Sequence, residues 1–539
     1  MTNMYFKSTT ALVVAVLVIS IVCGVQSVDP YSPAAYVPIM KQTNGIDFTA
    51  QACVIGAGFS GVGSVETLVK EGNMQNWLLI EAENRIGGRT KTATVGAGAN
   101  TYNVEEHGQW VQGDLRNPIL KMGSEIPASL GGPLRGGNSK WGEYDYYDNN
   151  GVKVGYNQGS SMGRAMINLY AAQDCVWHEI VPLIINGSLV DMSLRDCYAL
   201  CGFAPNTAEE YAAEAGLVAV EWGELSDITS CVNSGQWVAY SFYGDDARNG
   251  TANFVNDQRG VQIVAKWALI RNGVQLNDTR IHYNTKISNV NTDTNVITAI
   301  RNGNTVKYQC DTIINTISIG ALQASLRKNA NLVTPLPPLA VQASIHKYHM
   351  AFFRKLFLQY KTKFWGDKAH FLITPKNRGL AFANWNSVDY PNFYPGSRIL
   401  LSSQNGPDSN KYSNMDPISF LKEATQQLVA VFGSAAAFEN LELNGWYIGN
   451  DTYDPSLDGS YSNRPATLSE VEFRAMWAPV KGHYFPSGEA ACDFLNGYIT
   501  GAYLQGITAA RRALINLGLP TAGPAEDNEC YRPPAGWVA

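Results

Sequence analysis

The sequence has few charged residues and no excess of basic ones. Charged side chains make up 16% of its 539 residues, whereas about a quarter is usual for a soluble domain. This low fraction, together with 45% hydrophobic residues, excludes a disordered polyelectrolyte and a coiled coil. The 40 Lys and Arg against 46 Asp and Glu give a net charge of -6, so no basic surface for nucleic acid or an anionic membrane is expected. The length is that of a globular chain of about two to four domains.

Long apolar runs are also lacking, apart from one near the start. Residues 11–22 are apolar, follow Lys7 and precede the small residues Val25 and Ser27, which predicts a secretory signal peptide over residues 1–27. The run is about half of the roughly 20 residues that a membrane helix needs. We therefore expect a secreted, extracellular protein without a membrane anchor. Glycosylation sequons fit that location and begin at Asn186, Asn249, Asn277 and Asn450.

Metal-binding motifs are missing as well. The seven histidines form no His-x-x-x-His pair and the cysteines form no Cys-x-x-Cys pair, so we expect no metal site. Of nine cysteines, Cys23 lies in the predicted signal peptide, which leaves eight (9 minus 1). An even number permits disulfides in an oxidising compartment, and Cys197 and Cys201 are close enough to pair locally, but the sequence assigns no pairing. The proline-containing tail, residues 521–539, is expected to be poorly ordered unless Cys530 anchors it.

Glycines form a motif that binds dinucleotides. Gly56, Gly58 and Gly61 follow an apolar stretch that begins at Ala50, and Glu81 ends the next apolar strand 20 residues after Gly61 (81 minus 61). In a βαβ unit these glycines allow a tight turn and the close approach of a pyrophosphate to a helix N-terminus, while the acid accepts from ribose hydroxyls. A lone glycine motif is weak, but strand, helix and acid together predict a dinucleotide site.

The rest of the chain carries both helical and strand patterns. Residues 281–300 and 305–314 predict a hairpin with an Asn-Gly turn. Residues 131–161 are rich in Gly, Asn, Tyr and Asp, which predicts an irregular exposed connection and no core element. Residues 497–514 predict a long helix with small residues that let another group approach closely.

A second glycine pair extends the first motif. Arg85, Gly87-Gly88 and Arg89 follow Glu81 closely, and the two arginines could bind phosphate and ring oxygens. This extension resembles the FAD-dependent amine oxidases, the family of monoamine, polyamine and L-amino acid oxidases. Further blocks between residues ~50 and 515 resemble polyamine oxidases in the same order. They are Asp257-Gln258-Arg259-Gly260, residues 353–358 with 363–365, Gly459-Ser460-Tyr461-Ser462-Asn463, Gly488-Glu489 and residues 496–503.

The resemblance implies an α/β fold with two interleaved domains. A discontinuous Rossmann-type FAD-binding domain would alternate with a substrate domain built from a mixed sheet and helices. The expected segments are 49–126, 250–347 and 461–520 for FAD and 127–249 and 348–460 for the substrate. Monoamine oxidases attach FAD through a cysteine near the block that matches residues 459–465, and this chain has no cysteine there. Noncovalent FAD is therefore expected.

The resemblance also implies which residues contact FAD. Glu489 matches an acid near the pyrophosphate and the ribityl chain, and the helix after Gly497 would direct its amides toward the flavin. Ala491 and Cys492 depart from the usual Thr-Ser pair, so one hydroxyl contact to FAD is expected to be missing. The full set of expected contacts is Gly56, Gly58, Gly61, Glu81, Arg85, Gly88, Arg89, Glu489 and Gly497.

Three further residues are assigned to the reaction by resemblance. Lys355 matches the catalytic lysine that holds a water at flavin N5, and desolvation there would favour its neutral form. The alternative is a solvated lysine in a basic strand. Tyr461 and Tyr498 match the positions that flank the substrate amine, and the alternative is that both are ordinary core tyrosines.

Polyamines are extended polycations, so their cleft needs spaced carboxylates and apolar walls. By resemblance, Glu105 is such a carboxylate and Trp110 is part of the wall. Further candidates for substrate contact are Glu224, Glu221 and Glu106; an acidic surface stripe without function is the alternative for any one of them. The sequence departs from the family at His107, where a glycine is usual, and this change affects the expected loop shape and substrate register.

Together these implications predict a secreted, FAD-dependent polyamine oxidase. The family transfers hydride from the carbon beside the amine nitrogen to the flavin and reduces oxygen to hydrogen peroxide. Spermine or spermidine and oxygen are the expected partners, and a monomer is expected. One alternative is an L-amino acid oxidase or another amine oxidase of the family, which would need a positive group for the substrate carboxylate. The other alternative is a secreted flavoprotein without turnover.

Overall fold

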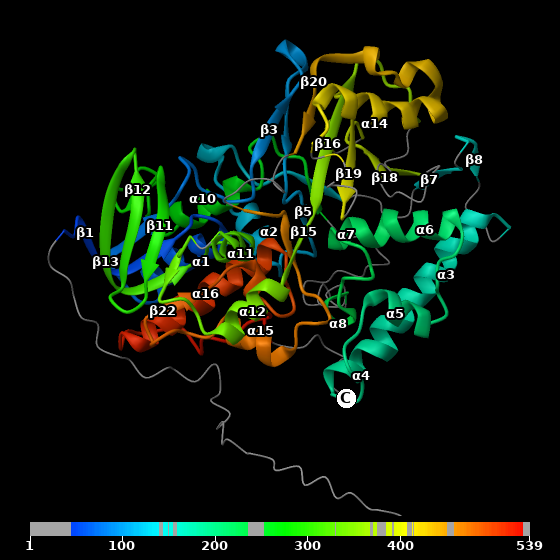
Figure 1. Cartoon of the computed structure of the whole chain (residues 1–539). Coiled ribbons are helices and arrows are strands. Elements are labelled where there is room, and N and C mark those ends of the chain that lie inside the picture. The colour runs from blue at the N-terminus through cyan, green and yellow to red at the C-terminus, as the bar shows by residue number, and fades with distance from the viewer. Residues whose placement is uncertain are drawn as a thin grey trace, which may run out of the picture.

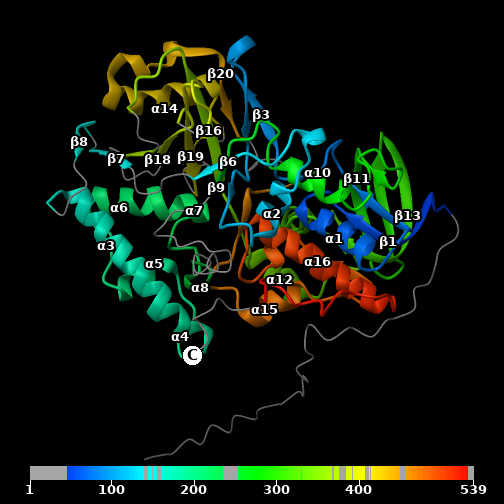
Figure 2. The same cartoon turned by 180° about the vertical axis from the view of Figure 1, so that it is seen from behind.

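The computed structural model describes residues 45–138, 144–148, 150–154, 159–234, 253–328, 330–366, 370–374, 384–390, 393–406, 412, 414–449 and 457–531. Two large sheets with surrounding helices organise these residues, as Figures 1 and 2 show from opposite sides. The predicted α/β fold is therefore confirmed. The predicted signal peptide and the sequons at Asn249 and Asn450 lie outside the described residues.

The first sheet has eight strands and contains the strands on either side of the first glycine motif. Its order is β10 (Ile281–His282), β2 (Trp77–Ile80), β1 (Phe48–Ile55), β13 (Asn304–Asn315), β12 (Val296–Arg301), β11 (Thr285–Asn291) and β14 (Val333–Thr334), and β22 (Tyr484–Pro486) also pairs with β13. β1 is parallel to β2 and β13, whereas β12 is antiparallel to β11 and β13. The sheet thus combines three distant parts of the chain, while the predicted domain boundaries stay a prediction.

The predicted hairpin turn is present in this sheet between β12 and β13, but residues 281–300 form three strands, β10, β11 and β12, and only β12 is the first arm of the hairpin. Its turn residues Asn302 and Gly303 have φ values of 48° and 84°, which asparagine and glycine adopt most readily. Next to it, Val54 of β1 is paired with Leu79 of β2 and Ile314 of β13. All three side chains are buried, as expected for parallel strands covered on both faces.

Helices α1 (Phe59–Lys70) and α16 (Ile499–Asn516) pack so closely that glycine is required between them. A Cβ atom on Gly506 would lie 2.0 Å from the carbonyl oxygen of Ser60, and one on Gly63 would lie 2.6 Å from that of Tyr503. The small residues predicted in the last long helix therefore let α1 approach. The two helices lie side by side in both views (Figures 1 and 2).

The second sheet has seven strands and a helix packed on it. Its order is β20 (Leu441–Ile448), β16 (Phe353–Tyr360), β19 (Ile399–Asn405), β18 (Asn384–Ser387), β17 (His370–Ile373), β7 (Tyr144–Tyr147) and β8 (Lys153–Val154). Leu356 and Leu400 of this sheet share an apolar cluster with Phe420 and Leu421 of α14 (Pro417–Phe432). β16 lies between β20 and β19 near one edge of this sheet and carries Lys355.

Residues 131–161 contain more regular structure than predicted. They include β6 (Gly136–Asn138), β7 and β8, and β7 pairs in parallel with β17. Tyr146 of β7 is buried among the apolar side chains of the neighbouring helices. The prediction of an irregular connection with no core element is wrong, because the aromatic residues of β7 favour a paired strand over the turns that the composition indicates.

A helical region precedes β9 and packs beneath the second sheet. Ser160, Ser193 and Thr207 cap the first turns of three of its helices, as small hydroxyl side chains do. The helices are α3 (Ser161–Cys175), α4 (Val181–Ile185), α5 (Leu194–Leu200), α6 (Ala208–Glu214), α7 (Val220–Trp222) and α8 (Cys231–Ser234). Figure 2 shows α3, α5 and α6 grouped away from the first sheet.

Shorter elements connect these parts. The helices are α2 (Pro118–Ser124), α10 (Gln262–Ile270), α11 (Ile319–Arg327), α12 (Leu339–Lys347) and α15 (Glu470–Met476). Three small sheets pair β3 (Thr92–Val95) with β4 (Tyr102–Glu105), β9 (Asn253–Val255) with β5 (Trp110–Val111) and β6, and β15 (His349–Ala351) with β21 (Tyr461–Asn463). In the described part of the chain, every helix is too short or too polar to cross a bilayer.

All eight cysteines of the described residues form disulfides. Cys175 pairs with Cys201 and Cys197 pairs with Cys231, so the local pairing of Cys197 with Cys201 does not occur, because each of them reaches a different segment. Cys53 of β1 is joined to Cys310 of β13. The fourth disulfide, Cys492–Cys530, anchors the tail as far as residue 531, where Tyr531 and Asn528 also contact side chains of α16.

Removing the Cys492–Cys530 disulfide should destabilise the protein and loosen the segment after residue 488. The disulfide spans 38 residues, for which loop closure contributes about 2 to 4 kcal/mol to the free energy of unfolding. We expect the Cys492→Ala/Cys530→Ala variant to lose this amount in denaturant unfolding and to exchange the amide hydrogens of residues 489–497 faster. The Cys175→Ala/Cys201→Ala variant is the control. Equal exchange at residues 489–497 in both variants would contradict the prediction.

Candidate active site

The first glycine turn packs against the second glycine pair, so that glycines of the two segments lie next to each other. Gly56 has φ +92°, and a Cβ atom on Gly61 would lie 1.8 Å from the Gly56 carbonyl oxygen. A Cβ atom on Gly88 would lie 2.9 Å from the Cα of Gly58. The two glycine loops therefore face each other at the N-terminus of α1, where backbone amides favour a phosphate.

Glu81 lies at the end of β2 and faces this turn. Its carboxylate accepts from the amide of Ala57 at 2.6 Å and from that of Glu83 at 2.8 Å. Burial raises the pKa of Glu81, and the two backbone hydrogen bonds act against that shift. An acidic side chain at this edge of the turn is placed to accept from a ribose hydroxyl.

The two arginines of the second glycine pair have different partners. Arg85 donates to the carbonyl oxygens of Gly88 at 2.6 Å and Thr90 at 3.1 Å, and so holds its own loop. Arg89 instead reaches out of the loop and donates to Glu489 Oε1 at 2.8 Å and to the Ser460 carbonyl at 3.0 Å. Arg89 thereby links the glycine loop to two segments more than 370 residues further along the chain.

Glu489 joins three of the predicted cofactor segments. One carboxylate oxygen accepts from Arg89, and the other accepts from the Ser462 hydroxyl and from the Gly497 amide at 3.1 Å. Gly488, just before it, has φ +133°, and a Cβ atom there would meet nothing within 4 Å. Glu489 therefore connects the second glycine loop, β21 and the turn before α16, next to a glycine that has room beside it.

Lys355 is buried in β16, with only 3% of its surface exposed. Its amine donates to the carbonyl oxygens of Glu105 at 3.1 Å and His107 at 2.7 Å and to Gln109 Oε1 at 3.0 Å. Burial lowers the pKa of Lys355, and the charges of Glu105 and Glu106 oppose that shift. The alternative of a solvated lysine is therefore wrong.

The acids before His107 face different groups. Glu105 is 2% exposed, and its Oε2 accepts from the Val261 amide at 3.3 Å; burial raises the pKa of Glu105. Glu106 lies 3.5 Å from Lys91 and 3.5 Å from the His107 ring. Neither acid lies on an exposed acidic stripe, because both side chains are buried.

Tyr461 and Tyr498 converge on one residue of α7, Glu221. The Tyr461 hydroxyl donates to the Glu221 carbonyl at 2.9 Å, and the Tyr498 hydroxyl donates to the Glu221 carboxylate. Burial raises the pKa of Tyr461 well above its ordinary value, and the nearby acids add to the shift. The two predicted tyrosines thus lie together with a carboxylate that is only partly buried.

Glu224 and Trp110 have structural partners. The Glu224 carboxylate is buried and binds the ring of His349, a contact that sequence reasoning missed because 125 residues separate the two. Trp110 packs edge-on against Phe254, with ring centroids 4.6 Å apart. Substrate contact by Glu224 and Trp110 stays a prediction. Among the candidate acids, Glu221 rather than Glu224 is joined to the tyrosines.

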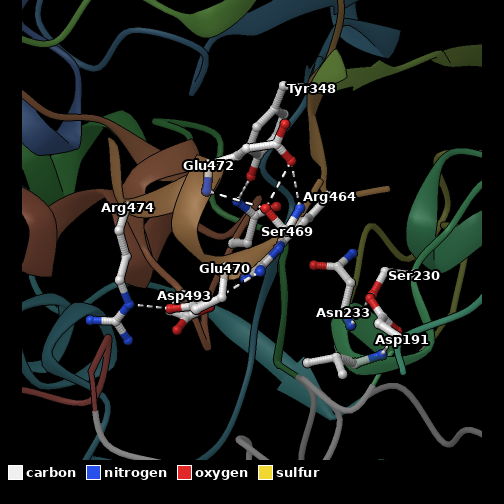
Figure 3. A network of polar contacts seen from close by, with 12 residues as sticks. Asp191, Ser230, Asn233, Tyr348, Arg464, Ser469, Glu470, Glu472, Arg474 and Asp493 are labelled. Atoms are coloured by element: carbon white, nitrogen blue, oxygen red, sulfur yellow. Dashed lines mark hydrogen bonds and ion pairs between the residues drawn. The ribbon is translucent and has the colours of Figure 1, made fainter. Parts of the chain in front are cut away.

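A buried arginine, also missed by the sequence analysis, holds the strand of Tyr461. Arg464 binds Asp493 at 2.8 Å and Glu470 at 2.9 Å, as Figure 3 shows. Its carbonyl oxygen also accepts from the Ser230 amide at 3.2 Å. Arg464 therefore links the end of β21, the segment after Glu489 and the start of α8. Its position three residues after Tyr461 was the only sequence signal.

Known proteins resemble this chain over most of its length. The family model described as flavin containing amine oxidoreductase matches residues 210–514, which is more than half of the chain. The chain belongs to the flavin-containing amine oxidoreductases. A model of the NAD(P)-binding Rossmann-like domain matches residues 54–119, the part that contains both glycine pairs.

Relatives of this amine oxidoreductase include plant enzymes. Polyamine oxidase 1 of Zea mays is 27% identical over 482 residues, which are 86% of this chain and 90% of the relative. Polyamine oxidase 7 of Oryza sativa subsp. japonica is 26% identical over 85% of this chain and 93% of the relative. A solved structure of putrescine oxidase bound to putrescine has a TM-score of 0.65 at 17% identity and covers 87% of this chain and 99% of that one. This last similarity shows the shared fold.

FAD, the cofactor of this family, fits the residues that are present. The facing glycine loops expose backbone amides that can bind a pyrophosphate, and Glu81 faces the first glycine turn. A Cβ atom on Gly488 would meet nothing within 4 Å. Gly56, Gly58, Gly61, Gly88 and Glu81 would hold the dinucleotide, with the Gly497 turn at the start of α16. When bound, FAD supplies the acceptor for the hydride removed from an amine.

Weakening the Glu489 junction should weaken FAD binding. In Glu489→Gln the side chain brings an N–H group against Arg89, Ser462 or Gly497, all of which donate to Glu489, so at least one charge-assisted hydrogen bond is lost. We expect the Kd for FAD to rise about tenfold or more, as for a loss of about 1.5 kcal/mol or more, in fluorescence titration of the apoprotein. Glu472→Gln, at an exposed helix cap, is the control. An unchanged Kd in Glu489→Gln would show that the junction does not position FAD.

His107→Asn should reduce the loss of stability in acid. Burial, opposed by Glu106, lowers the pKa of His107 from 6.5 to about 4. Between these values the unfolded chain takes up a proton that the folded chain does not, so the free energy of unfolding falls as the pH falls, by up to about 3 kcal/mol. We expect the difference in Tm between about pH 7 and pH 4.5 to be smaller in His107→Asn. The same difference in both proteins would contradict this assignment.

Proposed function

We propose that this protein is a secreted polyamine oxidase that binds FAD noncovalently, acts as a monomer on spermine or spermidine and produces hydrogen peroxide. The observation that carries the proposal is the group formed by Tyr461, Tyr498 and the Glu221 carboxylate. A cationic amine on a methylene chain is bound by aromatic faces and a carboxylate together. The plant polyamine oxidases, which match this chain over most of its length, support the same substrate class.

Glu221 is the acid best placed for the substrate. Glu105, Glu106 and Glu224 are buried, whereas Glu221 is partly exposed and lies with the two tyrosines. The Tyr498 hydroxyl donates to the Glu221 carboxylate and so holds this carboxylate beside the two aromatic rings. Because an amine is oxidised only after it loses a proton, the two rings would orient the amine while Glu221 binds a cationic nitrogen of the substrate.

Secretion is supported by the cysteines and by the sequons. Each of the eight cysteines in the described residues is in a disulfide, a pattern that belongs to oxidising compartments. The sequons that begin at Asn186 and Asn277 are exposed on the surface, where glycosylation requires them. Both observations agree with a signal peptide over residues 1–27.

A substrate panel tests the proposed function. The purified holoenzyme is assayed for peroxide with spermine, spermidine, their acetylated forms, a monoamine and L-amino acids, with mass analysis of the products. We expect turnover of polyamines and product masses that identify the cleaved bond. Turnover of L-amino acids alone would replace the proposed substrate class, and a yellow protein without turnover of any of these amines would contradict the proposal.

Removal of the Glu221 charge should weaken polyamine binding selectively. In Glu221→Gln we expect KM for spermine to rise about tenfold, equivalent to about 1.4 kcal/mol, and KM for a monoamine to change less. Glu179→Gln removes the same charge from an exposed helical position and is the control. If KM rises equally for both substrates, Glu221 does not recognise the second charge of a polyamine.

A further inference from the structure

One short segment supplies every hydrogen-bond acceptor that the structure gives to the Lys355 amine. The three acceptors are the carbonyl oxygens of Glu105 and His107 and the side-chain oxygen of Gln109. The segment lies against two parts of the FAD site: a Cβ atom on Gly108 would lie 3.2 Å from Thr90 Cγ2 and 2.7 Å from Ile499 Cδ1. Lys355 is therefore held where the second glycine loop meets the start of α16.

Three acceptors match the three N–H donors of an ammonium group. A neutral amine has two N–H groups and a lone pair, so one of the three oxygens would then face the lone pair without a hydrogen bond. The acceptors thus favour the protonated amine, while burial favours the neutral one. The protonation state of the Lys355 amine therefore depends on residues 105–109. Among them, Gln109 provides the only side-chain acceptor for this amine.

The orientation of the Gln109 amide follows from this contact. Because an ammonium group only donates, Gln109 must turn its oxygen toward Lys355 and its Nε2 away from it. The side chain is 0% exposed, and its Nε2 has no hydrogen-bond partner among the described residues. A buried N–H without a partner is costly, so this Nε2 group is suited to a polar partner such as a water or a ligand atom.

Glu105 shows the same feature. Its Oε1 is buried and has no hydrogen-bond partner in the described part of the chain, although Oε2 accepts from Val261. The segment that holds Lys355 therefore contains one donor and one acceptor that the protein leaves unsatisfied. Each of these two groups suits a polar partner and does not suit apolar packing.

We propose that Gln109 is a positioning residue, which holds the Lys355 amine in its three-acceptor setting and directs its own amide N–H toward the cofactor or the reacting amine. The proposal rests on the flavin chemistry of the family and does not depend on the polyamine specificity proposed above. Gln109 acts through Lys355, so its effect is expected in the protonation behaviour of the site. Other groups that act on Lys355 or on its acidic neighbours are Glu105, Glu106, His107, Arg85, Arg89, Lys91, Tyr394 and Tyr447.

The test is a pH titration of the visible absorbance of the bound flavin in the holoenzyme without substrate. The step that belongs to Lys355 is the one that disappears in Lys355→Met. In Gln109→Leu, which removes one acceptor, this step should move to lower pH by about one unit, as for one charge-assisted hydrogen bond. In Gln109→Glu, which adds a negative charge at the same place, it should move to higher pH by at least as much.

Gln359→Leu is the matched control for damage to the fold. Gln359 is a buried glutamine on the same strand as Lys355 and donates to Asn100 and Ser397, so its loss should lower stability without moving the step. Opposite shifts in the two Gln109 variants would establish the proposal, and Gln109→Glu alone decides it if Gln109→Leu does not retain FAD. An unmoved step in the Gln109 variants, or the absence of any step that Lys355→Met removes, would overturn it. The substrate panel is a separate measurement, so the shift of the Lys355 step can be interpreted even if the polyamine proposal fails.

Discussion

The site depends on the hydrogen bonds of one buried carboxylate, that of Glu489. The fold assembles its dinucleotide-binding part from segments hundreds of residues apart, and the second glycine loop, β21 and the turn before α16 do not belong to the first sheet. Glu489 connects these segments, because its two oxygens accept from Arg89, Ser462 and Gly497. The Glu489 carboxylate thereby connects the second glycine loop, the strand of Tyr461 and the turn before α16, and the hydrogen bond from Arg89 to the Ser460 carbonyl adds a second link.

Two buried basic side chains, Arg464 and Lys355, also connect distant segments through their hydrogen bonds. An uncompensated buried charge costs several kcal/mol, so each of these side chains constrains its neighbours to supply partners. Arg464 requires Asp493 and Glu470, and it thereby fixes the strand that ends just after Tyr461. The Lys355 amine binds three oxygens from residues 105–109, at and just after the end of β4. Buried polar contacts therefore position the strand of Tyr461 and the Lys355 amine.

The sequence predicted the parts of the site that are local in the chain. Gly56, Gly61 and Glu81 lie within one βαβ unit, where spacing determines geometry, and the Asn302 turn follows from φ preferences alone. Residues 131–161 were predicted wrongly, because their composition indicates turns while pairing with β17, more than 200 residues away, makes β7 a strand. The contact between Glu221 and Tyr498 spans 277 residues, and no spacing rule distinguishes Glu221 from Glu224.

His107 shows why a departure from the family pattern at a central position is compatible with the same site. The residue does not adopt a positive φ, so the backbone does not require glycine there. The Lys355 amine binds the main-chain oxygen of His107, and any residue supplies that oxygen. The imidazole lies 3.5 Å from the Glu106 carboxylate, and its pKa is lowered by desolvation and, to a smaller extent, by the charge of Lys355. Position 107 therefore needs only a backbone conformation that places its carbonyl oxygen at Lys355. The side-chain acceptor for the Lys355 amine comes from Gln109.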